Sequence, residues 1–242
     1  MCFSVKIDKN IKNIAKRFKS NIAIEEFHYL KSLQFMEKEV SKDYLKSQLK
    51  LARKPRSDIF KTPQEDERIY PNFFAPVITW NQGQRVIYPM RYRVRKNAEQ
   101  EIPSKYNVFN ARLDSLETRK TWSNLFLRNH GLFPFKQFYE YVEAEGTTQL
   151  ISFYPKEKEL WAPCLWDYWE SEDKKIHFYS FALITENAPA EIEKMGHDRC
   201  PIFIEEAAID EWLQVEHMNR DQAYKILNKI KRPYYEYSWI RN

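Results

Sequence analysis

Apolar residues recur at three- and four-residue spacing between residues 22 and 51, at Phe27, Leu30, Leu33, Met36, Val40 and Tyr44. This period is typical of an amphipathic helix and predicts one over about 22–51. Another stripe of the same helix is basic and comprises Lys38, Lys42, Lys46 and Lys50. Acidic residues interleave with these lysines, so the stripe is either a solvated face or a basic surface for a nucleic-acid backbone.

Most of the remaining chain consists of short apolar or alternating segments, which are typical of β-strands. The pattern predicts strands at 3–7, 77–80, 85–94, 132–142, 148–154, 159–166, 175–184 and 201–205. Residues 81–84 form a turn signal between the second and third of these strands. Further helices are predicted over 113–129, 206–214 and 219–231. The polar, proline-containing segment 53–72 is predicted to be a loop.

The order of these elements indicates the fold class. Strands follow one another about every ten residues with turn signals between them, which favours a curved, mainly antiparallel, barrel-like sheet. The helices lie mainly near the two ends of the chain and flank the sheet. We therefore expect an α+β fold. A chain of 242 residues is long enough for one large domain or two small ones.

Composition limits the cellular compartment and the kinds of binding partner that we expect. The 39 basic and 34 acidic side chains give a formal net charge of +5, which suits a polyanionic partner without proving one. No apolar run approaches the length that a membrane span requires, and charged residues interrupt any signal-like stretch near residue 1. The three cysteines, Cys2, Cys164 and Cys200, support neither a disulfide framework nor a zinc site. We expect a cytoplasmic protein with no cofactor and no metal, associated with the nucleoid if its source is bacterial.

Cys2 has a chemical potential that no internal cysteine shares. If Met1 is removed, Cys2 presents an α-amine and a thiol on adjacent carbons. The amine condenses with an aldehyde to a Schiff base, and the thiol then closes a five-membered thiazolidine on the same carbon. The unperturbed pKa values of both groups, about 8 and about 8.5, leave them reactive near neutral pH.

Several short motifs occur in a fixed order after Met1-Cys2. They are Phe74-Ala75-Pro76, Met90-Arg91-Tyr92, Asn110-Ala111-Arg112, Phe138-Tyr139-Glu140-Tyr141 and His197-Asp198-Arg199-Cys200-Pro201. In this order, the motifs resemble those of the SOS-response-associated peptidase (SRAP) family. The resemblance runs from Cys2 to about Leu213 and is that of a divergent member. It implies one SRAP-like domain over 1–242, in which the helix at about 22–51 is an insertion.

The resemblance also implies a function. Members of the family shield abasic sites in single-stranded DNA by covalent attachment, so we expect Cys2 to form a thiazolidine crosslink after Met1 is removed. The expected partner is single-stranded DNA that contains abasic sites, bound by a monomer. The peptidase activity in the family name is the removal of Met1, either autocatalytically or by an ordinary aminopeptidase.

The matched motifs assign roles to three further residues. Glu140 would orient and deprotonate the Cys2 amine, or move protons at the ring oxygen of the sugar. His197 would act as acid and base in ring opening and in reversal of the crosslink. Asn110 would hold the amine or a substrate oxygen. Considered singly, Glu140 also fits a solvent-facing strand position, His197 a loop, and Asn110 a helix N-cap.

Arginines of the matched motifs are the expected DNA contacts. Arg112 and Arg199 would hold phosphates bidentately, with Arg91 and Arg93 as weaker candidates. Tyr92 is a candidate for stacking on a base that flanks the lesion.

The chain departs from the family pattern at two of these places. Phe3-Ser4 replaces the usual Gly-Arg after the cysteine, and Arg91-Tyr92-Arg93 replaces Arg-Trp-Gly. Two other functions remain open at this point: a cysteine peptidase that acts on other proteins, with His197 as base to Cys2, and a non-catalytic single-strand binder. Turnover separates the first from a crosslinking protein, because a crosslinker is consumed.

Overall fold

The computed structural model describes residues 4–96, 101, 106–156, 160–229 and 233–240. The strands are β1 Ser4–Lys6, β2 Asn21–Ile22, β3 Arg68–Ile69, β4 Phe74–Asn81, β5 Gln84–Tyr92, β6 Asn110–Arg112, β7 His130–Phe135, β8 Gln137–Ala144, β9 Thr147–Pro155, β10 Leu160–Glu170, β11 His177–Asn187, β12 Arg199–Pro201 and β13 Tyr235–Ile240. The helices are α1 Ile11–Phe18, α2 Ile24–Glu39, α3 Lys42–Gln48, α4 Lys120–Ser123, α5 Ala190–Glu193, α6 Ile209–Leu213 and α7 Arg220–Asn228. Short 3-10 turns comprise Leu113–Ser115, Glu206–Ala208 and Val215–His217.

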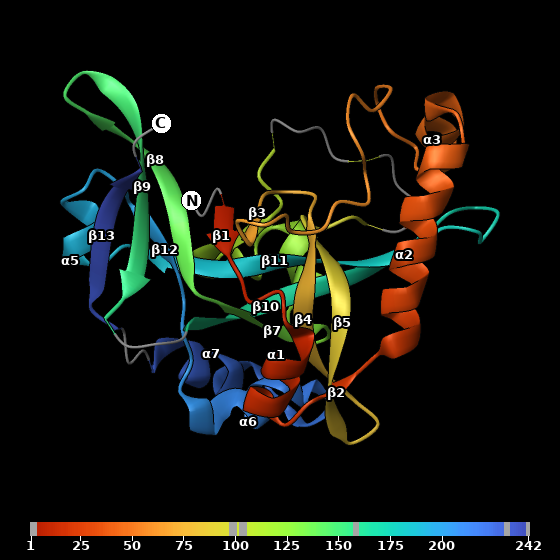
Figure 1. The fold of residues 1–242 in the computed structure, drawn as a ribbon. Helices are drawn as coiled ribbons and strands as arrows, with labels where there is room; N and C mark the ends of the chain where they lie inside the picture. Colours follow the sequence, from red (N-terminus) through yellow and green to blue (C-terminus); the bar gives the residue numbers. More distant parts are fainter. Residues whose placement is uncertain (1–3, 97–100, 102–105, 157–159, 230–232, 241–242) are drawn as a thin grey trace.

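A closed barrel lies at the centre of the molecule (Figure 1). Strands β11, β10, β7, β4 and β5 pair in this order, and a parallel pairing between β5 and β11 closes the ring. The other pairings within the ring are antiparallel. The β4–β5 hairpin turns through Gln82 and Gly83, both with positive φ (49° and 78°), which is the conformation of a two-residue type I′ turn.

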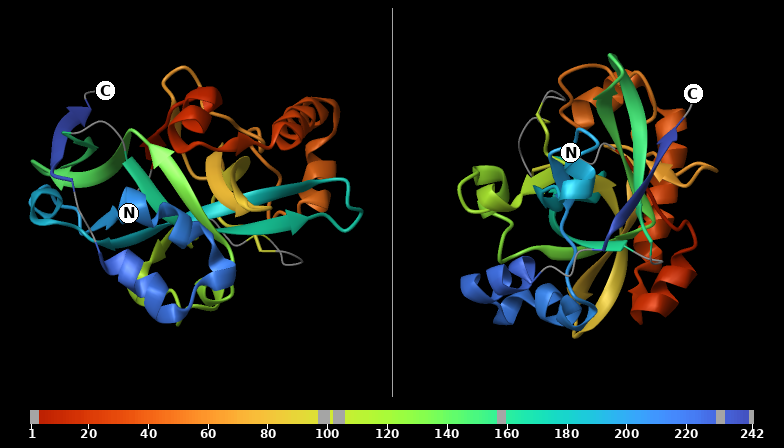
Figure 2. Two further views of the ribbon diagram at one scale, coloured as in Figure 1. Left: turned by 90° about the horizontal axis from the view of Figure 1, so that it is seen from below. Right: turned by 90° about the vertical axis from the view of Figure 1, so that its left-hand side faces the viewer.

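A second sheet stands beside the barrel, with strand order β13-β9-β8-β1-β3 (Figures 1 and 2). The chain passes from the barrel strand β7 into β8 after a single residue, Lys136. The N-terminal strand β1 is an internal strand of this sheet, because it pairs with β3 on one side and with β8 on the other. In the second pairing Ser4 lies opposite Tyr139. The sheet therefore holds the start of the described chain against β8.

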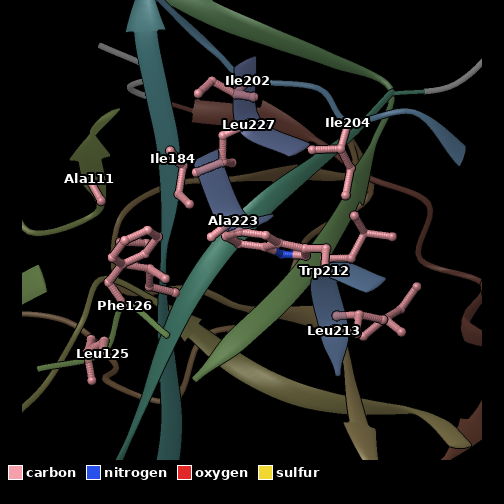
Figure 3. Packing of buried hydrophobic residues seen from close by; sticks show 14 of the residues in the cluster. Ala111, Leu125, Phe126, Ile184, Ile202, Ile204, Trp212, Leu213, Ala223 and Leu227 are labelled. Atoms are coloured by element: carbon pink, nitrogen blue, oxygen red, sulfur yellow. The ribbon is translucent and has the colours of Figure 1, made fainter. Parts of the chain in front are cut away.

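Three apolar clusters stabilise this arrangement. The first fills the barrel and the space toward the second sheet, around Phe133, Phe138 and Phe181. The second lies outside the barrel under α6 and α7, where Trp212, Ala223 and Leu227 pack against barrel strands (Figure 3). The third, around Trp169, lies beneath α2 and α3. Alternate residues of the barrel strands serve the inner and outer clusters, as the period of a strand requires.

The α+β class and the curved, mainly antiparallel barrel with flanking helices are confirmed. The single helix predicted over 22–51 is instead two helices. The first ends at Glu39, and the second begins after Ser41, whose side chain accepts a hydrogen bond from the Tyr44 amide at 3.1 Å. This N-cap satisfies a backbone donor that a continuous helix would not leave open.

Two other differences concern element boundaries. The helix predicted over 113–129 was wrong: this segment contains a 3-10 turn and only the four-residue helix α4. The strand predicted over 132–142 is two strands, β7 and β8, which belong to different sheets. Strand β13 was not predicted. Among the described residues, no helix has the length and apolar character needed to cross a membrane.

Candidate functional site

Glu140 lies on β8 at a position that faces the core. Its neighbours on the same face, Phe138 and Val142, are buried, whereas Tyr141 is exposed on the opposite face. Glu140 itself is only 3% exposed. Burial of a carboxyl group is costly unless it has polar partners, so a glutamate at this position indicates a specific role rather than a solvated one.

His197 provides that partner. It follows Gly196 in the loop between α5 and β12, and Gly196 has φ +87°, a conformation that side chains rarely adopt. The His197 Nε2 atom lies 3.1 Å from the Glu140 Oε2 atom, and the two side chains are 10% and 4% exposed. The carboxyl group and the imidazole therefore meet in a nearly closed environment.

The hydrogen bonds of His197 define where its protons are. The Nδ1 atom lies 2.8 Å from the Arg199 carbonyl oxygen, which only accepts, so Nδ1 carries a hydrogen and donates it. The Arg199 amide at 3.4 Å from the same Nδ1 is then no hydrogen bond, because both atoms are donors. Contact between Nε2 and the Glu140 oxygen requires one further proton, either on the imidazole or on the carboxyl group. The distance between the two atoms is short enough for a proton to pass directly between the carboxyl group and the imidazole.

Hydrogen bonds hold both the backbone and the side chain of Asn110 in place. It begins β6, which pairs in parallel with β11. Its backbone amide donates to the Asn107 side chain at 3.1 Å, and its side-chain oxygen accepts from the Tyr92 hydroxyl at 3.3 Å. Asn110 is 4% exposed. The Asn110 side chain is therefore oriented by the core and is no helix N-cap.

Arg112 and Arg199 flank the end of β11. Arg112, on β6, lies opposite Thr185 of β11. Arg199, on β12, lies opposite Asn187 of β11. Arg112 is exposed and makes two hydrogen bonds to Asp114, at 3.1 and 2.6 Å, which raise its pKa. Arg199 is buried, and its Nη1 atom donates to the Asn187 side chain at 2.5 Å. Burial, together with the charge of Arg112, lowers the pKa of Arg199.

A pocket of about 370 Å³ lies beside Asn110 and Arg112, and its lining also includes Arg119; Arg199, Glu140 and His197 do not line it. Thr185 also lines this pocket and was missed in the sequence analysis. Its hydroxyl is fully buried and has no hydrogen-bond partner among the described residues. The pocket has no acidic lining residue among those that form it, so it offers cationic and polar groups to an anion. A threonine in a barrel strand gives no sequence signal for such a role.

The three remaining DNA-contact candidates differ from expectation. Arg91 is buried and donates to Glu101 at 2.5 Å, so its charge is already compensated. Arg93 is buried too, and its Nη2 atom donates to the Tyr106 carbonyl at 3.4 Å. Neither arginine presents an open cationic surface to DNA in this structure.

Tyr92 cannot stack on a base in this structure because it has no exposed surface. Its ring packs in the barrel core against Phe181 and Phe109, at centroid distances of 5.2 and 5.5 Å. The assignment as a stacking residue is therefore corrected to a positioning contact, through its hydroxyl, with Asn110. Tyr92 is buried because its position on β5 faces the interior of the barrel.

The structure thus brings Glu140 and His197 into contact and groups Asn110, Arg112 and Arg199 around the end of β11. Cys2 lies outside the described residues. No group of three or more His, Cys, Asp or Glu side chains that could hold a metal ion occurs within the described part of the chain. Cys164 and Cys200 are buried thiols, and burial raises the pKa of Cys164.

Comparison with known structures shows the fold. A protein from Bacteroides thetaiotaomicron aligns with a TM-score of 0.70 and 13% identity, over 100% of this chain and 93% of that one. A protein from Bordetella bronchiseptica gives 0.60 and 17%, over 84% and 96%. A phage-related protein from the same organism gives 0.56 and 14%, over 72% and 81%. No curated protein matches the chain.

A family model extends over nearly the whole chain, residues 1–241, and includes every residue of the site described above. The model is that of the SOS response associated peptidase (SRAP) family. Since the match is not limited to one motif or one half of the barrel, the chain belongs to this family.

Proposed function

We propose that this protein binds single-stranded DNA as a monomer and becomes covalently attached to abasic sites through Cys2. Membership of the SRAP family implies a role in the SOS response and in binding of DNA at abasic sites. Covalent attachment through Cys2 goes beyond what family membership implies and is the specific part of the proposal. The observation that supports it most directly is the contact between the Glu140 and His197 side chains, which lie 3.1 Å apart and are almost closed to solvent.

The chemistry explains why such a pair is useful. An abasic sugar is mainly a closed hemiacetal, and opening it to the aldehyde requires a proton on the ring oxygen and removal of one from the hydroxyl. The Cys2 amine then adds to the aldehyde carbon, and loss of water gives the Schiff base. The thiol adds across the carbon–nitrogen double bond, its proton passes to nitrogen, and the thiazolidine closes. An acid and a base at one carbon assist each of these transfers.

The remaining site residues would bind and orient the substrate. The Asn110 amide, held by Tyr92, would bind the amine or a sugar oxygen. The pocket beside it, which Asn110 and Arg112 line, would accept the sugar. Arg112 and Arg199 would neutralise neighbouring phosphates, which makes binding salt-dependent and largely blind to sequence.

The position of β1 supports a role for the N-terminal segment. Ser4, two residues after Cys2 in the sequence, lies opposite Tyr139, and Tyr139 directly precedes Glu140. The 1,2-aminothiol exists only once Met1 has been removed. The proposed peptidase activity is therefore this single cleavage, which prepares the protein for its reaction with DNA.

The test uses the full chain, with removal of Met1 verified by intact mass, and an abasic single-stranded oligonucleotide. We expect a protein–DNA species that survives denaturation and never exceeds one DNA per protein. Cys2→Ala should lose this species, although its free amine should still give an imine that borohydride traps. Cys200→Ala serves as the matched cysteine control and should react normally.

Two results would refute the proposal. One is the absence of any stable adduct from protein that has lost Met1. The other is repeated turnover of a peptide substrate by wild type but not by Cys2→Ala, which would identify a peptidase acting on other proteins.

A further inference from the structure

Arg68 is held in a fixed orientation at the seam between β3 and β1. It lies opposite Lys6 in the β1–β3 pairing, and its Nε atom donates to the Ser4 hydroxyl at 2.8 Å. The guanidinium carbon lies 3.8 Å from the centroid of the Tyr139 ring and 5.0 Å from that of Tyr70. Stacking of this kind holds the plane of a guanidinium and leaves its edge available for hydrogen bonding.

The charge of Arg68 has no carboxylate partner among the described residues. The Arg68 Nη2 atom is buried and has no hydrogen-bond partner within the same residues. Other arginines differ: Arg17 pairs with Glu206 at 2.8 Å, and Arg220 with Glu117 at 2.7 Å. A partly buried cation without an acidic partner loses hydration and gains little in return. Such a group is well suited to bind an anionic ligand.

The same guanidinium lies against β1 and β8, on the face of the sheet opposite the Glu140 side chain. Ser4, which it contacts, is two residues from Cys2 in the sequence, and Tyr139, on which it stacks, is the neighbour of Glu140. We propose that Arg68 binds a phosphate of the DNA strand next to the lesion and so helps to fix the strand relative to the N-terminal segment. This inference rests on the proposed function for the identity of the anion. A hydrogen bond from a guanidinium to a phosphate is charge-assisted and therefore stronger than a neutral one.

The experiment measures equilibrium binding of an undamaged single-stranded oligonucleotide across a range of salt concentrations. Loss of one phosphate contact should weaken binding about tenfold at moderate salt and lower the slope of log affinity against log salt by about 0.7. We expect this for Arg68→Ala, with a smaller loss for Arg68→Lys. Arg56→Ala, which removes an exposed arginine from the loop before β3, is the matched control.

A second variant separates DNA contact from a purely structural role. Ser4 has no exposed surface and accepts the hydrogen bond of the Arg68 Nε atom. Ser4→Ala removes this hydrogen bond but keeps the guanidinium charge, so it should lower the unfolding temperature and leave the salt slope of DNA binding unchanged. Thermal unfolding of each variant is measured in parallel.

Two outcomes overturn the inference. Either Arg68→Ala binds DNA with the affinity and salt slope of Arg56→Ala, or folded Arg68→Ala loses affinity while its salt slope stays that of wild type. Because undamaged DNA forms no crosslink, this result is independent of Cys2. Failure of the covalent proposal with retained dependence on Arg68 would leave a single-strand binder, and the two failures are therefore distinguishable.

Discussion

At the scale of single residues, Glu140 is an ionisable side chain at a buried position of a paired strand. Glu140 lies opposite Ile151 of β9, and its neighbour Tyr139 lies opposite Ser4 of β1, so pairing on both sides of β8 restricts the backbone at this point. The side chain lies in a face that is otherwise apolar. Acid–base catalysis depends on such preorganisation, because the proton must already lie close to the atom that receives it.

Glu140→Gln should therefore slow crosslinking by about 10²- to 10⁴-fold, because the amide keeps the shape of the side chain but cannot exchange a proton at neutral pH. Glu143→Gln, on the exposed face of the same strand, should react at the wild-type rate. The measurement is the initial rate of denaturation-resistant adduct at saturating DNA. Equal rates for the two variants would exclude Glu140 from the proton transfers.

The sequence could reveal some of these residues and not others. The order of motifs around Asn110, Glu140 and His197 singled them out. Burial removes the simpler assignments of Glu140 to solvent and of Asn110 to a helix cap, whereas His197 does lie in a loop, in contact with Glu140. Burial of Tyr92 and the ion pair of Arg91 depend on which face of β5 points into the barrel. That facing is fixed by barrel closure, which no local pattern encodes.

At the scale of elements, His130 links β7 to the helical layer. Its Nδ1 atom donates to the Trp212 carbonyl at 2.8 Å, and its Nε2 atom accepts from the Leu127 amide at 3.1 Å. The ring also stacks on Trp212 at 3.7 Å. Every polar atom of the neutral imidazole is satisfied, so a second proton would replace an acceptor by a donor. Burial accordingly lowers the pKa of His130 to about 4.

This pKa predicts a pH dependence of stability. Since the folded pKa is below the unfolded value of about 6.5, the stabilisation is complete above pH 6.5 and is lost as pH falls toward 4. The loss should be about 3 kcal/mol. Chemical denaturation at several pH values measures it. His130→Gln cannot take up the proton, so the difference between wild type and variant isolates this group; a difference that does not change with pH would contradict the assignment.

Element boundaries were less predictable than element types. The apolar residues between 113 and 129, such as Leu116, Trp122 and Leu125, are buried in the second cluster. The spacing of these apolar residues indicates that they are buried, but it does not require a helix, because short turns can bury the same side chains. Strand β13 has an alternation that matches a strand, but it lies at the edge of its sheet and depends on pairing with β9. In both segments, 113–129 and β13, tertiary contacts determine the secondary structure more than local sequence preference does.

At the scale of the molecule, the segment 22–51 and the candidate site lie on different sides of the barrel. Figures 1 and 2 both show α2 on one side and the sheet of β8, β9 and β13 on the other. Basic residues near α3 already have acidic partners: Lys54 lies 2.6 Å from Asp43, and Lys50 lies 2.7 Å from Glu172. Of the lysine stripe, Lys50 thus has an acidic partner, and the stripe lies away from the sheet that carries Glu140.

Neutralising this stripe should have little effect on DNA binding. We expect Lys38→Ala, Lys42→Ala and Lys46→Ala, combined in one variant, to change affinity for single-stranded DNA by less than about twofold at physiological salt, because charges more than a Debye length from the bound strand are screened. Arg112→Ala is the positive control. A loss as large as that of Arg112→Ala would show that α2 and α3 belong to the DNA-binding surface.

The internal position of β1 has a consequence for protein synthesis. The N-terminal strand is made first, yet its partner β8 begins at residue 137, and His197 follows 60 residues later. At ordinary ribosomal speeds, roughly 10 to 40 s separate Cys2 from His197. In the proposed reaction, an aminothiol formed early would therefore meet cellular aldehydes before Glu140 and His197 exist. Assembly of the candidate site from distant segments would thus delay the proposed chemistry until the domain is almost complete.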